Sequence, residues 1–434
     1  MPRPSQSQVP TRLQALRRLM AQRKVDVYLA PSADEHQNEY LPAYKRRREA
    51  ISGFTGSAGD AAIAAGEAHL WVDSRYHLQA DQEVDARQFQ VHKLGSPGVQ
   101  DWFGWLTAFE ETRGPLRVGF DPYLINLRVA ERLQGALRNS KSALAPLEGN
   151  LIDGVWTDRP AAPASPIYAL PESLTGEPAA GKLTRVRAQL EQAGAAALVL
   201  TKLDEVAWLT NLRGADIPYN PVFEAYLVVG RDGAQCFTDN PVPAVVREGL
   251  AGHVRFRPYG ELAAGLAEAV QALSGARLWL DRDTTSHGVR LLAGEAPVLL
   301  DAPNPVVRLK AVKNPVEIDR AQQGHLSSGA AKVRSFSRVQ SLLSQGQPVS
   351  EADYAQLLQE EYEREDGFSD LSFNTIAAFG ENGAVVHYGT PDPRKQLVPG
   401  GLLLVDSGIQ ALGATTDDTR TIAIGPPSDL QRES

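Results

Sequence analysis

Cysteine is nearly absent from this chain of 434 residues, which contains a single one, Cys236. One cysteine excludes a disulfide framework and the cysteine-rich classes of zinc site, because both need several thiols. Cys236 lies in the apolar stretch Gln235-Cys236-Phe237, where a thiol usually packs as a small hydrophobe. We therefore expect it to belong to a core.

Long apolar runs and a surplus of basic residues are also lacking. No run approaches the ~20 apolar residues that a membrane-spanning helix needs, and the N-terminus has no apolar core of a secretion signal. The net charge of −8 argues against a partner that is nucleic acid or a membrane surface, because such binding needs clustered basic residues. We expect a cytoplasmic protein.

The first 25 residues carry arginine and lysine but no acid, as a mitochondrial transit peptide does. A helix of the fold explains this segment better. Thr11 and Gln14 form a capping pattern, and apolar residues follow at helical spacing, namely Leu13, Leu16, Leu19 and Met20. The helix leads directly into a strand-like segment at 25–30.

The length allows about three domains, at ~150 residues each. The clearest boundary is a stretch in which three prolines and several small residues cannot continue a helix or a central strand. We interpret it as a linker at 157–168. It would separate a first domain at 1–156 from a second at 169–304, with a third at 305–434.

The segments on the two sides of this linker resemble each other. Each begins a helix at a Thr-Arg pair and continues into an apolar strand, an Asp-Glu pair and two strands that end in an aromatic-x-Asp pattern. The matching positions are Thr11 and Thr184, Asp34-Glu35 and Asp204-Glu205, and Trp71 to Asp73 and Phe237 to Asp239. This pattern favours a duplicated α/β unit with a mixed sheet. Chance similarity is the alternative.

The third region combines two helices with a series of strands. Asn314-Pro315 is a good helix start, and Ser350 is a good cap for a second helix that runs through Tyr362. Strands are predicted at 375–378, 384–388, 402–410 and 415–424. Two helices followed by an antiparallel meander predict an α+β domain.

Two acids, Asp406 and Asp417, lie at the ends of strand-like runs. A tight turn at 411–413 would place them opposite or nearly opposite each other, with Cβ atoms ~4.5–5.5 Å apart. Like charges repel at that distance, and a divalent cation bound by both, or a pair of cations, removes the repulsion. Ala411-Leu412 is a poor pair for a primed turn, so a bulge at Gly413 is an alternative register. The competing interpretation is a solvated strand end and a turn cap.

His387 ends the predicted strand 384–388, just before the turn Gly389-Thr390-Pro391. A histidine at such a place is most often a surface residue or part of a satisfied core. Its imidazole is also able to transfer protons or orient a substrate near neutral pH. The residues alone leave both interpretations open.

Several motifs together make the chain resemble a known family. Those in the third region are Leu371 to Ile376, Gly383 to Tyr388, Val405-Asp406-Ser407-Gly408 and Thr415 to Thr421. Those further upstream are Gly53 to Gly59, Val72-Asp73-Ser74-Arg75-Tyr76, Leu203 to Gly214 and Lys310 to Asn314. The chain resembles Xaa-Pro aminopeptidase (aminopeptidase P) of the "pita-bread" superfamily, which also contains prolidase, creatinase and methionine aminopeptidase. The resemblance covers nearly the whole chain.

The resemblance implies an α/β and α+β fold of the long, three-domain branch. Two tandem creatinase-like N-terminal domains would precede an incomplete pita-bread peptidase domain. It also implies a metallopeptidase that hydrolyses the bond between an N-terminal residue and a following proline. The partners would then be peptides with proline in the second position, and a homodimer is implied by the resemblance alone.

The resemblance assigns roles to four residues. Asp406 and Asp417 match the two aspartate ligands of a pair of divalent metal ions of the manganese type. His387 matches a catalytic histidine that contacts the substrate and assists proton transfer, and Arg75 matches a substrate-binding arginine of the first domain. The two ions would lower the pKa of a bridging water and polarise the scissile carbonyl, with a glutamate as general base.

The chain also departs from the family pattern. The family places one more histidine ligand and two glutamate ligands well downstream of the second aspartate, where this sequence has no residues. On this ground we expect a truncated member whose activity is in doubt. The alternatives are a non-catalytic module that binds peptides or proteins and an inert fragment.

Overall fold

The structure is a computed structural model that describes residues 8–138, 140–295 and 297–433. The chain divides into two compact units, each of which is described by itself. The first consists of Met1–Ala169, Ala179–Ile217 and Val222–Ala311, and the second of Leu170–Pro178, Pro218–Pro221 and Val312–Ser434. The domain limits drawn from the sequence stay predictions.

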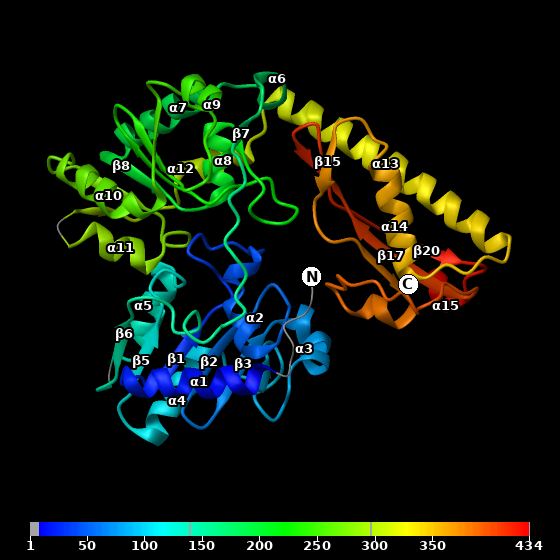
Figure 1. The fold of residues 1–434 in the computed structure, drawn as a ribbon, viewed down its shortest axis with the longest axis horizontal. Helices are drawn as coiled ribbons and strands as arrows, with labels where there is room; N and C mark the ends of the chain where they lie inside the picture. The colour runs from blue at the N-terminus through cyan, green and yellow to red at the C-terminus, as the bar shows by residue number, and fades with distance from the viewer. Residues whose placement is uncertain (1–7, 139, 296, 434) are drawn as a thin grey trace. The chain divides into compact units, whose positions relative to one another are not determined.

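The first half of the first unit contains a six-stranded sheet flanked by helices (Figure 1). Its elements are α1 (Val9–Gln22), β1 (Val27–Ala30), η2 (Ala43–Lys45), α2 (Arg47–Ser52), β2 (Asp60–Ala64), β3 (Ala68–Val72), η3 (Ser74–Tyr76), α3 (His77–Glu83), β4 (Gln90–Lys93), α4 (Trp102–Arg113), β5 (Arg117–Phe120), α5 (Leu127–Ala136) and β6 (Ala143–Pro146). All four residues of β1 are buried, as expected for a strand with neighbours on both sides and a helical layer on each face.

The second half of the first unit repeats this arrangement. Its elements are β7 (Tyr168–Ala169), α7 (Ala179–Gln192), β8 (Ala195–Leu200), α8 (Leu203–Thr210), β9 (Leu212–Arg213), β10 (Tyr226–Gly230), β11 (Ala234–Phe237), α9 (Ala244–Gly249), β12 (Val254–Arg257), η4 (Tyr259–Glu261), α10 (Leu262–Gln271), β13 (Arg277–Leu280), α11 (His287–Ala293), β14 (Leu299–Leu300) and α12 (Pro305–Ala311). Cys236 is fully buried in its core, as its apolar surroundings in the sequence indicate.

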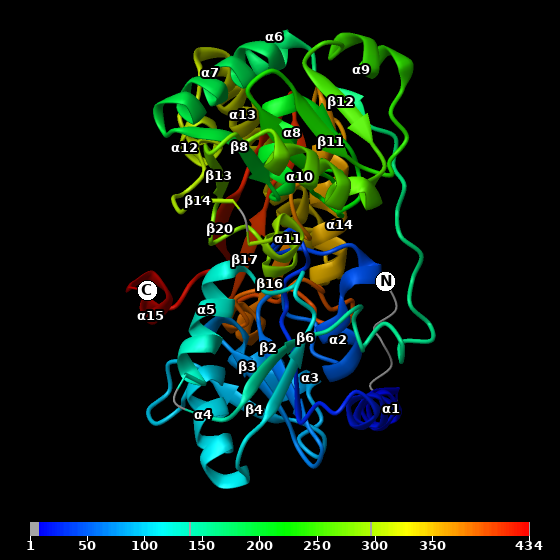
Figure 2. The same ribbon diagram turned by 90° about the vertical axis from the view of Figure 1, so that its left-hand side faces the viewer.

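The strand orders confirm the duplication. One sheet runs β4-β3-β2-β1-β5-β6 and the other β12-β11-β10-β8-β13-β14. Several strands of each sheet are labelled in Figure 2. In both, the central strand pairs antiparallel with one neighbour and parallel with the other. Both sheets are therefore mixed, and the same chain path occurs twice.

The two repeats meet through equivalent segments. Asn126 caps α5 and Ser286 caps α11, and these two residues form an antiparallel bridge. The Leu127 N–H donates to the Thr285 carbonyl at 3.0 Å, and the His287 N–H donates to the Ile125 carbonyl at 2.7 Å. Backbone groups at the two helix starts, which lack partners within their helices, thereby join the repeats.

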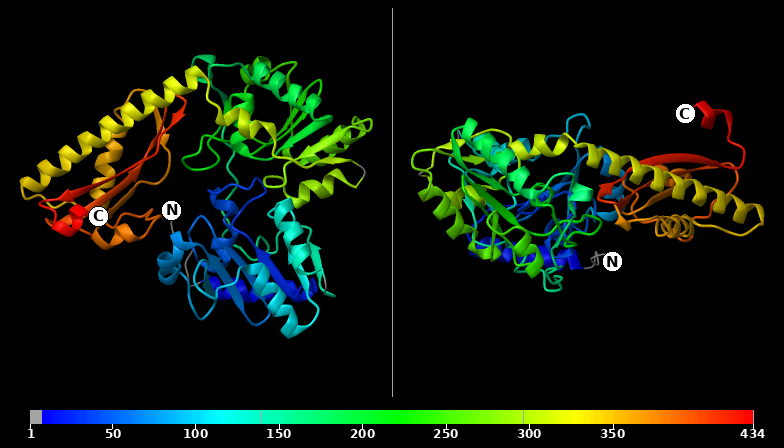
Figure 3. Two further views of the ribbon diagram at one scale, coloured as in Figure 1. Left: turned by 180° about the vertical axis from the view of Figure 1, so that it is seen from behind. Right: turned by 90° about the horizontal axis from the view of Figure 1, so that it is seen from above.

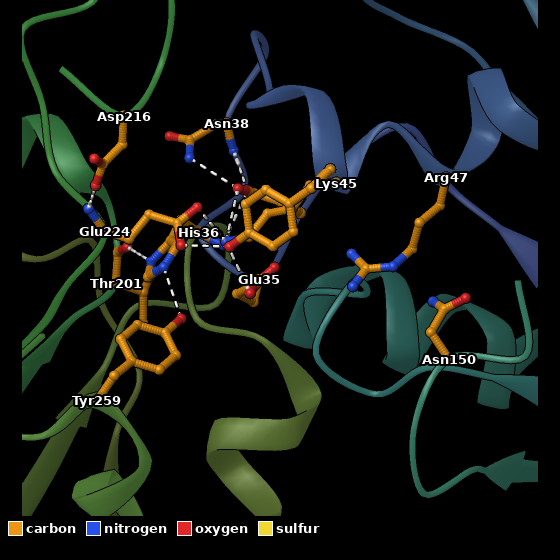
Figure 4. Close-up of polar contacts among 12 residues, drawn as sticks. Glu35, His36, Asn38, Lys45, Arg47, Asn150, Thr201, Asp216, Glu224 and Tyr259 are labelled. Atoms are coloured by element: carbon orange, nitrogen blue, oxygen red, sulfur yellow. Dashed lines mark hydrogen bonds and ion pairs between the residues drawn. The ribbon is translucent and has the colours of Figure 1, made fainter. Parts of the chain in front are cut away.

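A buried polar cluster also joins the two repeats (Figure 4). Lys45 of the first repeat lies 2.8 Å from both Glu35 and Glu224, and its side chain is only 1% exposed. Burial alone would raise the pKa of Glu35, but the Lys45 ammonium outweighs this effect and holds it at about 2. Removing one partner of such a buried pair leaves an uncompensated charge and costs ~3–5 kcal/mol.

His36 lies inside this cluster and bridges the repeats. Its Nδ1 is 2.8 Å from the Thr201 carbonyl and its Nε2 is 2.9 Å from the Tyr259 hydroxyl. Because a carbonyl only accepts, Nδ1 carries the proton and Nε2 accepts from Tyr259. Burial lowers the pKa of His36, as does Lys45. The nearby acids raise it, and they are Asp34, Glu35 and Glu224.

In its described residues the second unit contains two long α-helices, two short ones, a 3₁₀ helix and a set of strands. Its elements are α6 (Glu172–Thr175), α13 (Pro315–Ser344), α14 (Glu351–Tyr362), β15 (Phe368–Leu371), β16 (Ile376–Phe379), η5 (Gly380–Ala384), β17 (Gly401–Ser407), β18 (Ile409–Ala411), β19 (Ala414–Thr415), β20 (Asp418–Ile424) and α15 (Asp429–Glu433). Figure 3 shows α13 beside the two long strands β17 and β20. No helix in the described residues is long and apolar enough to cross a membrane.

Both predicted helix starts in this unit are confirmed. Asn314 caps α13 and forms a capping box with Glu317, with Pro315 as the first helical residue. Ser350 caps α14 and forms the same box with Asp353. Each box satisfies two of the backbone groups that a helix start leaves without partners.

The His36 cluster predicts that acid destabilises the first unit. A histidine whose folded pKa is lowered stays neutral in the fold, while the unfolded chain takes up its proton below pH ~6.5. Stability is therefore complete above this pH and is lost as the pH falls, by up to ~1.4 kcal/mol per pH unit for each such imidazole. Hydrogen exchange of β8 between pH 7.5 and 5 measures this loss.

A His36→Gln variant isolates the contribution of His36 from that of other buried histidines. A glutamine amide donates to Thr201 and accepts from Tyr259 without titrating, so we expect a flatter pH profile. The matched control is His325→Gln on an exposed face of α13, which should keep the wild-type profile. Identical profiles for His36→Gln and the wild type would contradict the prediction.

Candidate functional site

The hairpin from β17 to β20 brings the two predicted metal ligands together. In its register Asp406 is opposite Thr419, and Ser407 is opposite Asp418. Asp417 therefore lies diagonally across from Asp406, on the same face of the hairpin. The prediction that the two acids are near each other is confirmed, although they are diagonal rather than directly opposite.

The turn of this hairpin is formed by Leu412 and Gly413. Both have positive φ, 54° and 80°, as a primed two-residue turn requires. Ala411 pairs with Ala414, and the same register continues along β17 and β20. The register slip that the sequence allowed at Gly413 is therefore absent from this hairpin.

Gly408 lets the hairpin change direction between β17 and β18. A Cβ atom there would lie 1.9 Å from the Thr416 carbonyl oxygen, far inside van der Waals contact. The Ser372 hydroxyl donates to the same oxygen at 2.7 Å, and the Ser372 N–H donates to the Gly408 carbonyl at 3.0 Å. Only glycine permits this close crossing, which places Asp417 beside Asp406.

The two carboxylates lack full compensation. Oδ1 of Asp406 is buried and accepts no hydrogen bond from the described residues. Burial raises the pKa of Asp417, and the neighbouring Asp406 carboxylate raises it further. A buried acceptor without a donor is unfavourable by ~1–3 kcal/mol or more, so this arrangement favours a bound cation.

Asp418 points to the opposite face from Asp417, because side chains alternate along a strand. It is held there by α13: the Lys332 ammonium lies 2.8 Å from its Oδ2 and donates to its backbone carbonyl at 2.6 Å. The Ser328 hydroxyl donates to Oδ1 at 3.3 Å. Lys332 is only 2% exposed. The charge of Asp418 is thus neutralised by Lys332 on the face of the hairpin that packs against α13.

Sequence reasoning missed this ion pair. Lys332 lies in a helix whose spacing of apolar residues gives no sign that a lysine faces inward. Asp418 directly follows Asp417 and therefore belongs to the opposite face of any strand they share. That alternation was the only available signal that the two acids have different roles.

His387 does not end a strand, which corrects the prediction for 384–388. The chain forms the 3₁₀ helix η5 up to Ala384 and then continues as a loop in which His387 is half-buried. The Gly389 N–H donates to the His387 carbonyl at 2.8 Å. The β-branched pair Val385-Val386 suggested a strand, but side-chain hydrogen bonds to this loop override that local preference.

A residue far away in sequence is linked to the His387 loop through Asn374. The Tyr219 hydroxyl donates to Asn374 Oδ1 at 3.0 Å, and Asn374 donates to the Gly389 carbonyl. Gln410 donates to the Tyr219 carbonyl at 2.9 Å. Tyr219 has φ 67°, which is unusual for a bulky residue. Nothing local in the sequence indicates this contact.

Arg75, the fourth predicted site residue, belongs to the first unit. It lies in η3, where its guanidinium binds the Asp73 carboxylate through Nε at 2.9 Å and Nη2 at 2.8 Å. The hydrogen bond to Asp73 raises the pKa of Arg75, so it is a permanent cation. The side chain is 39% exposed, which leaves it accessible to a carboxylate or carbonyl group.

The described residues therefore provide only part of the ligand set that a metal ion needs. Asp406 and Asp417 offer adjacent carboxylate oxygens, one of them an orphaned buried atom, and carboxylates suit Mg²⁺ and Mn²⁺. The described residues contain no group of three or more histidine, cysteine, aspartate or glutamate residues placed to hold an ion. The described residues thus bring together two carboxylates suited to a metal ion, and a bound ion would need further ligands from elsewhere, such as water or substrate.

Three models of known protein families match this chain, and together they span most of it. Residues 12–155 match the creatinase/prolidase N-terminal domain, and residues 158–317 match a second family with the same description. Residues 324–434 match metallopeptidase family M24. The two N-terminal matches coincide with the two repeats of the first unit.

Individual relatives extend this agreement. The chain is 38% identical over 432 residues to a probable Xaa-Pro aminopeptidase P of Penicillium rubens, covering 98% of this chain and 70% of that protein. It is 37% identical over 433 residues to one from Aspergillus fumigatus, covering 98% of this chain and 66% of that protein. The chain thus spans about two thirds of the length of these relatives.

A solved structure has the same fold. It is an X-prolyl aminopeptidase from Caenorhabditis elegans, described as a cytosolic enzyme with a di-nuclear active site. The TM-score is 0.93 at 30% identity, and the match covers 97% of this chain and 71% of that one. The fold predicted from the sequence is confirmed by this similarity.

The crossing at Gly408 gives a prediction for stability. A Gly408→Ala variant forces Cβ into the Thr416 carbonyl, so the hairpin must shift, and overpacking of this kind costs ~1–3 kcal/mol or more. Urea unfolding followed by a probe of the second unit measures the loss.

The control is Gly329→Ala in the middle of α13, where an added Cβ has no neighbour within 4 Å. This change should stabilise the helix by ~0.5–1 kcal/mol, since alanine is the better helix former. A Gly408→Ala variant as stable as the wild type would show that the hairpin tolerates another path.

Proposed function

Because this chain belongs to the Xaa-Pro aminopeptidase family of M24 metallopeptidases, we propose that it acts in the hydrolysis of the bond between an N-terminal residue and a following proline. Its substrates would be peptides with proline in the second position. We further propose a cytoplasmic location and, from the family resemblance alone, a homodimer.

The single observation that carries the proposal is the apposition of two uncompensated carboxylates. Asp406 has a buried oxygen without a donor among the described residues. The pKa of Asp417 is raised mainly by burial and next by the charge of Asp406. The hairpin register and Gly408 hold this arrangement in place. A divalent cation bound between the two groups would relieve this repulsion.

We assign the two carboxylates to a pair of divalent ions, and we propose manganese. When bound, the ions would supply Lewis acidity to the scissile carbonyl and to a water nucleophile. Asp406 and Asp417 would hold them, while Lys332 keeps Asp418 away on the other face. The description of the relative from C. elegans as di-nuclear supports the number of ions.

The other two predicted residues would act on the peptide. His387 is half-buried in its loop, and its imidazole would contact the substrate and transfer a proton near neutral pH. Arg75, fixed by Asp73, would bind the peptide with its permanent charge. Both roles rest on the family resemblance and are part of the proposal.

Manganese binding by the purified chain tests the ligands. We expect Asp406→Asn and Asp417→Asn each to weaken the binding measured by isothermal titration by more than about tenfold, because even residues that only support metal ligands have effects of this size. Asp366→Asn, at an exposed position of the same unit, should bind as the wild type does.

Activity is measured in the same samples. Manganese-loaded chain should release the N-terminal residue from a peptide with proline in the second position, and neither Asp406→Asn nor Asp417→Asn should do so. If the wild type neither binds manganese stoichiometrically nor cleaves the peptide, the proposed function of this chain is wrong. Binding without cleavage would support the metal site and reject catalysis by this chain alone.

A further inference from the structure

A fully buried carboxylate lies beneath the loop that carries His387. Glu351 is the first residue of α14 and has no exposed surface. No lysine or arginine in the described part of the chain lies within ion-pair distance of it. A buried charge needs strong compensation, so the groups that bind Glu351 indicate its role in the structure.

All four hydrogen bonds to this carboxylate come from one segment, 379–392. Oε1 accepts from the Phe379 N–H at 2.6 Å and from Asn382 Nδ2 at 3.0 Å. Oε2 accepts from the Tyr388 hydroxyl at 2.9 Å and from the Asp392 N–H at 3.0 Å. Two backbone and two side-chain donors, spread over fourteen positions of chain, thus converge on one residue.

The same helix start also holds the far end of the loop. The Glu351 N–H donates to the Lys395 carbonyl at 3.0 Å, and Ser350 forms an antiparallel bridge with Gln396. The negative charge of Glu351 is itself favoured at this place by the α14 dipole. The loop is therefore attached to the N-terminus of α14 at its beginning, its middle and its end.

Tyr388 connects this anchor to His387. It is the next residue in the chain, and its hydroxyl donates to Glu351 while it accepts from Asn382 at 3.0 Å. One residue further along the chain, Gly389 is held by Asn374, whose side-chain amide donates to the Gly389 carbonyl. Since no regular structure supports residues 385–400, these side-chain contacts fix the path of the backbone at His387.

We propose that Glu351 is a positioning residue for His387: its carboxylate gathers the 379–392 loop and thereby sets the place of the imidazole. The role of His387 toward substrate rests on the proposed function. The positioning by Glu351 is a property of this chain's own contacts and is measurable without substrate or metal.

Glu351→Gln is the main test. A glutamine keeps the shape but replaces one carboxylate oxygen with a donor, so two of the four loop donors lose their acceptor. We expect amide exchange at Phe379 or Asp392 to rise by about tenfold or more, while exchange in β17 stays unchanged. In a spectrum of selectively labelled histidines, the imidazole signal of His387 should shift or broaden, and the other seven should not.

The matched control is Glu363→Gln at the exposed end of the same helix, which should change neither readout. Tyr388→Phe removes a single hydroxyl and is the second variant if Glu351→Gln does not fold. It should move the His387 signal while the Phe379 amide stays protected. Where the chain cleaves peptide, a positioning defect appears as a lower kcat with little change in KM.

An unchanged His387 signal in both Glu351→Gln and Tyr388→Phe would overturn the proposal, even if loop exchange rises. So would a loss of protection that spreads evenly through α14 and β17, because Glu351 would then only stabilise the unit. The proposed function fails separately, through absent manganese binding or absent cleavage by the wild type.

Discussion

Repulsion between Asp406 and Asp417 is the constraint around which the second unit is arranged. Two carboxylates on one face of a hairpin repel each other until a cation or a proton binds there, so the fold must hold them together by other means. The register of β17 and β20 and the crossing at Gly408 provide this restraint. The stability of the hairpin therefore offsets the electrostatic cost of a site prepared for a positive charge.

In the first unit, by contrast, buried charges of opposite sign lie next to each other. There, Lys45 is almost fully buried between Glu35 and Glu224, so that opposite charges compensate each other. His36 completes the contact as a neutral group with a donor on one side and an acceptor on the other. This cluster joins two repeats of one α/β pattern. Its charges are compensated by ion pairs, although Glu35 Oε2, Lys45 Nζ and Glu224 Oε1 have no hydrogen-bond partner among the described residues.

Much of this structure could be predicted from local sequence patterns. The caps at Asn314 and Ser350 follow from signals within a few residues, and the proximity of Asp406 and Asp417 follows from strand periodicity around one turn. The duplication follows from the similarity of two long segments. The failures are long-range. Val385-Val386 suggested a strand at His387, but that segment is a loop whose Tyr388 hydroxyl donates to Glu351, 37 positions earlier. Tyr219 reaches Asn374 across 155 positions, and no local pattern encodes such a contact.

Two buried charged residues of opposite sign, on adjacent helices, each position one part of the proposed site. Lys332 of α13 binds Asp418 and so fixes the β20 side of the hairpin. Glu351 of α14 accepts four hydrogen bonds from the His387 loop. Both side chains are almost completely buried, and α13 and α14 pack against each other in one core with Leu403 and Val405. Because α13 and α14 share one core, the side chains that hold Asp418 and the His387 loop belong to the same packed layer, as a preorganised site requires.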